Sequence, residues 1–231
     1  MPLIGQKLKG VADIVICVDS TGSMAPVIDN LKKEIHRFIT DLENPPEQGL
    51  QPVDWRIKVL GFRDLRVDRE PWVNLDADLV RSEAEARAQV EALTADGGGD
   101  EPESALDALW HATARTPWRP KCTRILTFFS DATGHLDLHP DTLSLGAVGS
   151  DASAVAQSLV EQNCFLHAWA PPSEIWNALG HLPKVVFTPL THVGDGLSSI
   201  DFGELMRNLR KTVSQTASEA IGGGGTTVPL C

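Results

Sequence analysis

Residues 14–23 read Ile-Val-Ile-Cys-Val-Asp-Ser-Thr-Gly-Ser, an apolar run followed by a carboxylate and by hydroxyls at two-residue spacing. The apolar run has the length and the β-branched content of a buried strand. Asp19, Thr21 and Ser23 therefore follow the carboxyl end of that strand, where their oxygens are placed to meet a cation the size of Mg²⁺. This stretch predicts a buried sheet with a metal site at its edge.

Apolar runs and amphipathic segments alternate along the chain, which predicts strands separated by helices. The expected strands span 12–18, 55–62, 72–75, 124–130, 164–170 and 184–188. The expected helices span 23–41, 79–93, 102–114, 151–162, 173–179 and 201–218, and 131–150 is a long connection. This order predicts an α/β fold with a doubly wound, mostly parallel sheet and helices on both faces.

The composition suits one large domain, because 231 residues with 42% hydrophobic and 22% charged content can bury a sizeable core. We expect that domain to span 1–220, with its core at about 10–215, and the glycine-rich tail 221–231 to be flexible. A net charge of -11 argues against an extended surface for nucleic acid or anionic membrane. No apolar stretch approaches the roughly 20 residues of a membrane span.

The four cysteines are scattered without a CxxC spacing, so neither a disulfide framework nor a zinc site is expected. The first ten residues lack the apolar core of a signal peptide. Together these features predict a cytoplasmic protein.

Three oxygen-rich loops follow or adjoin the predicted strands, and in a parallel sheet such loops converge at the carboxyl edge. The first holds Asp19 to Ser23, the second is the glycine-rich loop with Asp100, and the third holds Asp131. The predicted metal ligands are Asp19, Thr21, Ser23, Asp100 and Asp131. A set of carboxylates and hydroxyls favours Mg²⁺, with Mn²⁺ or Ca²⁺ as alternatives, over zinc or copper.

The chain here resembles the von Willebrand factor A domains that carry a metal-ion-dependent adhesion site. Their pattern is Asp-x-Ser-x-Ser after the first strand, a threonine in a glycine-rich loop and an aspartate after the fourth strand. Asp19, Thr21 and Ser23 match the first element, with Thr for Ser, and Asp131 matches the last. The resemblance implies a Rossmann-like sheet with one short antiparallel edge strand. The motif sequences of this chain are most similar to those of the intracellular, bacterial and alpha-kinase-associated branch.

The glycine-rich loop departs from that pattern, because Asp100 stands where adhesive A domains have threonine. A further carboxylate on the metal would hold the cation more tightly and attract an incoming acidic ligand less strongly. We expect Asp100→Thr to loosen the metal and to strengthen capture of an acidic peptide, as measured by calorimetry.

Each candidate also has a simpler interpretation. Thr21 and Ser23 could cap the following helix, Asp100 could be an N-cap, and Asp131 could be a turn residue. The loop His135-x-Asp137-x-His139 could hold a second, transition metal, although such a loop is more often solvated. Arg63 and Asp64, at the end of a strand, could line the binding face or support the structure by pairing with each other.

The metal pattern predicts a module that docks a protein partner, through an acidic residue, within an intracellular assembly or a stress or defence system. One alternative is an Mg²⁺- or Mn²⁺-dependent phosphoester hydrolase, although the sequence offers no clear nucleophile or general base. Another is a non-catalytic subunit of an AAA+ ATPase or kinase complex. The sequence leaves the partner and the oligomeric state open.

Overall fold

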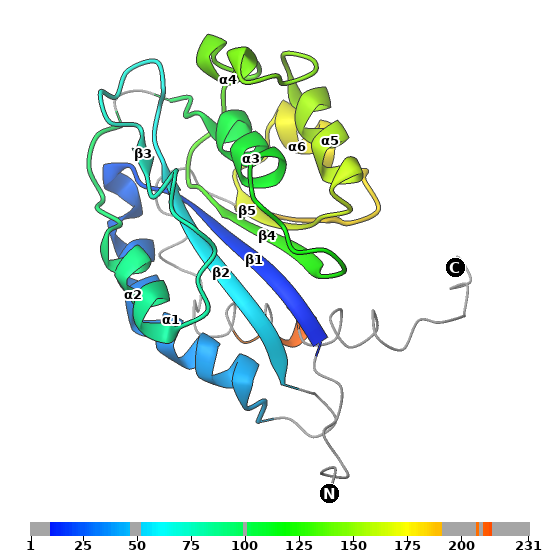
Figure 1. The fold of residues 1–231 in the computed structure, drawn as a ribbon. Coiled ribbons are helices and arrows are strands. Elements are labelled where there is room, and N and C mark those ends of the chain that lie inside the picture. The colour runs from blue at the N-terminus through cyan, green and yellow to red at the C-terminus, as the bar shows by residue number, and fades with distance from the viewer. Residues whose placement is uncertain (1–9, 47–51, 99–100, 191–206, 208–209, 214–231) are drawn as a thin grey trace, which may run out of the picture.

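The computed structural model describes residues 10–46, 52–98, 101–190, 207 and 210–213, which form a six-stranded sheet with helices around it (Figure 1). The strand order is β3-β2-β1-β4-β5-β6. The strands are β1 Gly10–Asp19, β2 Val53–Phe62, β3 Trp72–Val73, β4 Thr123–Phe129, β5 Phe165–Ala170 and β6 Val185–Pro189. All neighbours pair in parallel except β3, which pairs antiparallel with β2. The predicted α/β class and its antiparallel edge strand are confirmed.

Helices cover both faces of the sheet (Figure 1). One face packs against α1 (Ala25–Glu43) and α2 (Glu83–Glu91), and the other packs against α3 (Ala105–Ala114), α5 (Ala152–Glu161) and α6 (Glu174–Leu179). Alternate residues of β1 serve the two cores, with Ile14 and Ile16 in the first and Val15 and Cys17 in the second. Burial on both sides explains why this strand is a continuous apolar run.

The strand order reverses at β1, which lies between β2 and β4. The chain adds β2 and β3 on one side of β1 and then β4, β5 and β6 on the other. The loops that leave β1 and β4 therefore run in opposite directions from one point on the carboxyl edge, and such a point opens a crevice. Asp19 ends β1 at this crevice.

Two helices begin later than the sequence predicts. The prediction of a helix over 79–93 is wrong at its start, because Val80 pairs with Ile57 of β2. The prediction over 102–114 is wrong at its start because Glu103 forms a β-bridge with the loop after β4. In both cases a tertiary contact overrides local helix propensity.

The connection expected over 131–150 contains a short helix, α4 (Pro140–Ser144), which begins with proline. Of the helix predicted over 201–218, residues 207 and 210–213 are described, and they are helical. The remainder of that helix and the tail 221–231 lie outside the described residues. No helix in the described ranges is long and apolar enough to cross a membrane.

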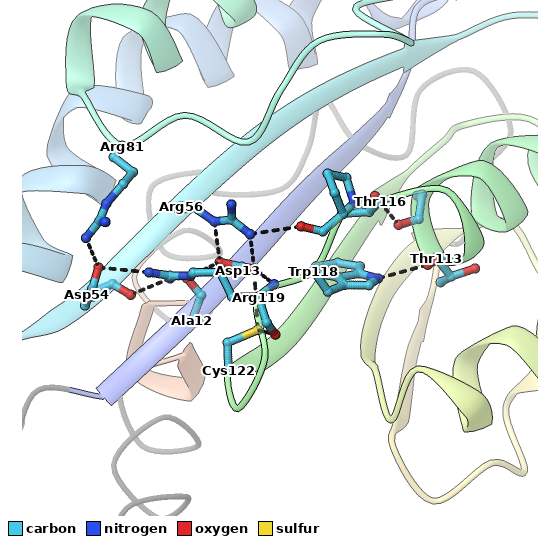
Figure 2. Close-up of polar contacts among 12 residues, drawn as sticks. Ala12, Asp13, Asp54, Arg56, Arg81, Thr113, Thr116, Trp118, Arg119 and Cys122 are labelled. Atoms are coloured by element: carbon cyan, nitrogen blue, oxygen red, sulfur yellow. Dashed lines mark hydrogen bonds and ion pairs between the residues drawn. The ribbon is translucent and has the colours of Figure 1, made fainter.

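An ionic network around Asp13 of β1 lies at the amino edge of the sheet, opposite the crevice (Figure 2). This carboxylate is fully buried and accepts hydrogen bonds from the Nε atoms of Arg56 and Arg119, at 3.0 and 2.7 Å. Burial alone would raise the pKa of Asp13, but the two arginines outweigh it and hold the pKa below its usual value. The network ties the connection between α3 and β4 to the central strand.

Candidate metal centre

Asp19 forms the buried base of the centre at the end of β1. Its Oδ1 accepts hydrogen bonds from the Thr21 amide at 2.9 Å and the Thr21 hydroxyl at 2.6 Å. Its Oδ2 accepts one from the Ser130 hydroxyl at 2.7 Å, which joins the loop after β4 to the loop after β1. The strand reversal therefore brings the first and third predicted loops together.

Thr21, Ser23 and Asp131 form a series of side-chain contacts that runs from Asp19 toward the protein surface. The Thr21 and Ser23 hydroxyl oxygens are 3.5 Å apart. The Ser23 hydroxyl donates to Asp131 Oδ1 at 3.0 Å, across 108 positions of sequence. Four of the five predicted ligands thus lie side by side, while Asp100 lies outside the described residues.

The helix-capping interpretation of Thr21 and Ser23 is wrong. The 3₁₀ turn Gly22–Met24 has Thr21 as its N-cap residue, yet the side chain makes no capping hydrogen bond. The helix α1 that follows is preceded by Met24 and also has no side-chain cap. Both hydroxyls instead contact the carboxylates of Asp19 and Asp131.

Glu103 is a fifth member of the centre that the sequence analysis missed. Its side chain is buried, and its Oε2 has no hydrogen-bond partner among the described residues. A Cβ atom built on Gly98 would lie 2.8 Å from Thr21 and 3.3 Å from Glu103 Oε1, so this loop glycine sits against both side chains. The predicted helix included position 103 in its first turn, where acidic residues are common because they interact favourably with the helix dipole. The sequence therefore contains no sign that Glu103 belongs to the centre.

The electrostatics of the centre favour a cation. Burial and, in decreasing order, the nearby carboxylates of Asp19, Asp64, Asp68 and Asp131 together raise the pKa of Glu103 to about 8. Burial also raises the pKa of Asp19, to about 6, although hydrogen bonds from Thr21 and Ser130 oppose the rise. A divalent cation would remove this repulsion and supply the partner that Glu103 Oε2 lacks.

The available donors fit a hard cation. They are carboxylate and hydroxyl oxygens, which suit Mg²⁺, Mn²⁺ or Ca²⁺ better than a soft metal. Within the described ranges no three His, Cys, Asp or Glu side chains are grouped so as to hold a metal by themselves. The hydroxyls of Thr21 and Ser23 would therefore have to complete the ligand set with Asp19, Glu103 and Asp131.

The loop with His135, Asp137 and His139 does not gather into a second metal site. His135 Nε2 lies 3.0 Å from Asp64 Oδ1, and Asp137 forms an ion pair with Arg66 at 2.9 Å. His139 instead caps α4, because its Nδ1 accepts a hydrogen bond from the Asp141 amide. The first two contacts tie the loop after β4 to the loop after β2.

Arg63 and Asp64 support the centre separately and do not pair with each other. The Arg63 guanidinium donates to the backbone carbonyls of Ser20, Glu70 and Thr94, and so joins three loops. Asp64 accepts hydrogen bonds from the Ser104 hydroxyl and the Arg66 amide. The structural role is borne out, although its partners differ from those expected.

Comparison with known proteins gives one relative in sequence and several in fold. No protein-family model matches this chain. The chain is similar to human integrin beta-4, with 25% identity over 177 residues, which are 70% of this chain and 9% of that protein. The chain therefore spans a small part of that relative.

Two solved structures share the fold. One is proximal thread matrix protein 1 from the mussel byssus with a zinc-occupied MIDAS motif, at a TM-score of 0.52 and 16% identity, covering 89% of this chain and 46% of that one. The other is the pilus adhesin SpaC from Lactobacillus rhamnosus GG, at a TM-score of 0.56 and 12% identity, covering 91% of this chain and 31% of that one. The fold of this chain is of the von Willebrand factor A type.

Proposed function

We propose that this chain is a protein-interaction module that binds a divalent cation, with Mg²⁺ preferred, and docks an acidic residue of a partner on it. The observation that carries this proposal is the convergence of Asp19, Thr21, Ser23 and Asp131 beside the unpaired oxygen of Glu103. Ser23 is exposed at the outer end of this chain of contacts, so a ligand can approach from solvent.

The fold neighbours support a binding role over a catalytic one, since their names describe a matrix protein and an adhesin. We further propose an intracellular setting, as a non-catalytic subunit of a larger assembly such as an AAA+ ATPase or kinase complex. Three described cysteines, Cys17, Cys122 and Cys164, are free thiols, which suits a reducing compartment.

Glu103 would also change the affinity of such a centre for an acidic residue of the partner. A third carboxylate on the metal neutralises more of its charge, so the cation is retained well and an acidic ligand is held less strongly. This is the behaviour expected from Asp100, and the two residues can be separated by substituting each alone.

The test is metal-dependent capture with a matched control. The full chain, the variant Asp19→Ala/Ser23→Ala and the control Asp29→Ala/Ser144→Ala are compared in Mg²⁺ by calorimetry and then as baits, with and without chelator. We expect the control to bind Mg²⁺ and to capture a partner that chelator releases, and the first variant to do neither. Equal Mg²⁺ binding by both variants would contradict the proposal. Mg²⁺-dependent turnover of p-nitrophenyl phosphate that the first variant loses would favour the hydrolase alternative instead.

A further inference from the structure

A second polar pocket lies apart from the metal centre, on the α3 face of β2. It has a volume of about 360 Å³ and shares no side chain with the proposed ligand set. Its lining comes from β2, the segment after β3, the end of α3 and the residue after α4, namely Lys58, Leu60, Leu75, Asp76, Ala77, Asp78, His111, Arg115, Pro117 and Leu145. We propose that this pocket binds a small aliphatic monocarboxylate, whose carboxylate is held by the Lys58 ammonium and the His111 ring.

Lys58 brings a positive charge to the inner wall of the pocket. The residue is 8% exposed, and its Nζ donates a hydrogen bond to the Leu75 carbonyl at 2.5 Å. An ammonium carries three donors, so two remain for another acceptor. Among the described residues no carboxylate lies within ion-pair distance of this Nζ. Burial lowers the pKa of Lys58, although the carboxylates of Asp76 and Asp78 act from further away to raise it.

His111 adds a neutral donor to the same wall. The residue is 9% exposed, and its ring lies edge-on to Trp72 and Trp110, which fix its orientation. Within the described ranges neither ring nitrogen has a hydrogen-bond partner. Burial lowers the pKa of His111 to about 4, helped by the nearby charges of Arg115 and Lys58, so the ring is neutral at pH 7 and carries one N–H donor.

The charges at the mouth select the class of ligand. Arg115 at the rim adds further donors, while Asp76 and Asp78 place two exposed carboxylates beside it. A single negative charge can reach Lys58 past these carboxylates, whereas a dianion such as phosphate meets more repulsion. Leu60, Leu75 and Leu145 supply an apolar wall, so the monoanion should carry an aliphatic group.

Calorimetry with isovalerate, L-leucine and inorganic phosphate tests the ligand class on the full chain. We expect isovalerate to bind and phosphate not to bind. L-leucine tests whether the pocket prefers an amino acid to a simple acid, because the ammonium of leucine would lie near Asp76 or Asp78. The site is supported whether leucine binds more tightly or more weakly than isovalerate. Chelator should leave isovalerate binding unchanged, since the pocket is separate from the metal centre. Absence of isovalerate binding, or equal binding of phosphate, would overturn the proposal.

Lys58→Met keeps the length of the side chain and removes its charge. We expect it to weaken isovalerate binding by about tenfold or more, since it removes a charged hydrogen bond. Lys32→Met on α1 is the matched control and should leave the affinity unchanged. NMR of the wild-type chain tests the same site without a substitution. Isovalerate should shift the methyl signals of Leu60, Leu75 and Leu145 but not those of Leu31. Unshifted pocket methyls, or equal binding by the two lysine variants, would sink the assignment.

Discussion

Glu103 places a buried carboxylate near Asp19 and Asp131, and its Oε2 has no partner in the described part of the chain. Such a group destabilises the metal-free protein near neutral pH, because the folded chain must either hold a desolvated and repelled charge or take up a proton that the unfolded chain does not bind. A bound cation would instead be stabilised by the same negative charge. In the proposed centre, Glu103 would therefore lower the stability of the metal-free protein and raise its affinity for the metal.

Glu103→Gln separates the two effects, because it removes the charge and keeps the shape. We expect the metal-free variant to unfold at higher urea than the wild type at about pH 7.5, with a gain of roughly 2 kcal/mol. We also expect its Mg²⁺ affinity to fall by about tenfold or more, measured by calorimetry. The neighbouring Glu101→Gln, in the same loop, should change neither quantity; an unchanged Mg²⁺ affinity in Glu103→Gln would exclude Glu103 from the ligand set.

His111 makes stability depend on pH in the acid range. Its pKa is about 4 in the folded chain and 6.5 in its ordinary state, so the unfolded chain binds a proton more readily between these values. Stability from this residue is present above pH 6.5 and is lost as the pH falls toward 4. We expect a loss of about 2 kcal/mol between roughly pH 7.5 and pH 5.

Urea unfolding of the wild type and His111→Gln at both pH values isolates this effect. Asp19 and Glu103 change the free energy of unfolding in the opposite direction as the pH falls. Their pKa values are raised in the folded chain, so the folded form binds protons before the unfolded form does. The difference between the two proteins removes that contribution. Identical pH slopes would show that His111 does not titrate on unfolding.

At the scale of elements, Gly98 of the glycine-rich loop packs directly against the candidate metal centre. Gly98 has φ +71°, and a Cβ atom there would lie 2.8 Å from the Thr21 side chain. Only glycine fits that approach without strain. The loop after β2 and the loop after β4 are joined in turn by the contacts of His135 with Asp64 and of Asp137 with Arg66. The proposed ligands are thus positioned by loops that contact one another.

Gly98→Ala should act on the metal as well as on stability. We expect a loss of about 1–2 kcal/mol in the free energy of unfolding and a weaker Mg²⁺ affinity, because the new methyl group displaces Thr21. Gly146→Ala is the matched control, since Gly146 also has positive φ, +100°, but nothing lies within 4 Å of its added Cβ. The control should lose stability alone; equal effects of both variants on Mg²⁺ affinity would refute the contact.

At the scale of the whole molecule, the proposed metal binding would be coupled to folding. The proposed ligands come from β1, the loop before α3 and the loop after β4, so only the folded chain can assemble them. A cation that binds the folded form alone stabilises it by about 2.7 kcal/mol at a hundredfold excess over its dissociation constant. For a chain of this size, that raises the melting temperature by several degrees.

We therefore expect Mg²⁺ to raise the melting temperature of the full chain and excess chelator to reverse the rise. The variant Asp19→Ala/Ser23→Ala should melt at one temperature with or without Mg²⁺. Differential scanning calorimetry measures both. A rise of the same size in the variant would mean that the cation acts elsewhere on this acidic protein.

By itself the sequence determined the fold class and part of the centre, because both depend on local pattern. The apolar run ending at Asp19 predicts a strand, which is buried on both faces, and the hydroxyls two residues apart predict the loop that meets Asp131. The tertiary structure alone decided that Glu103 leaves the predicted helix to join the centre, since its β-bridge with the loop after β4 spans distant sequence. It also decided that Lys58 and His111 share a pocket. Charge and burial act through space, and no local pattern records which distant side chains will meet.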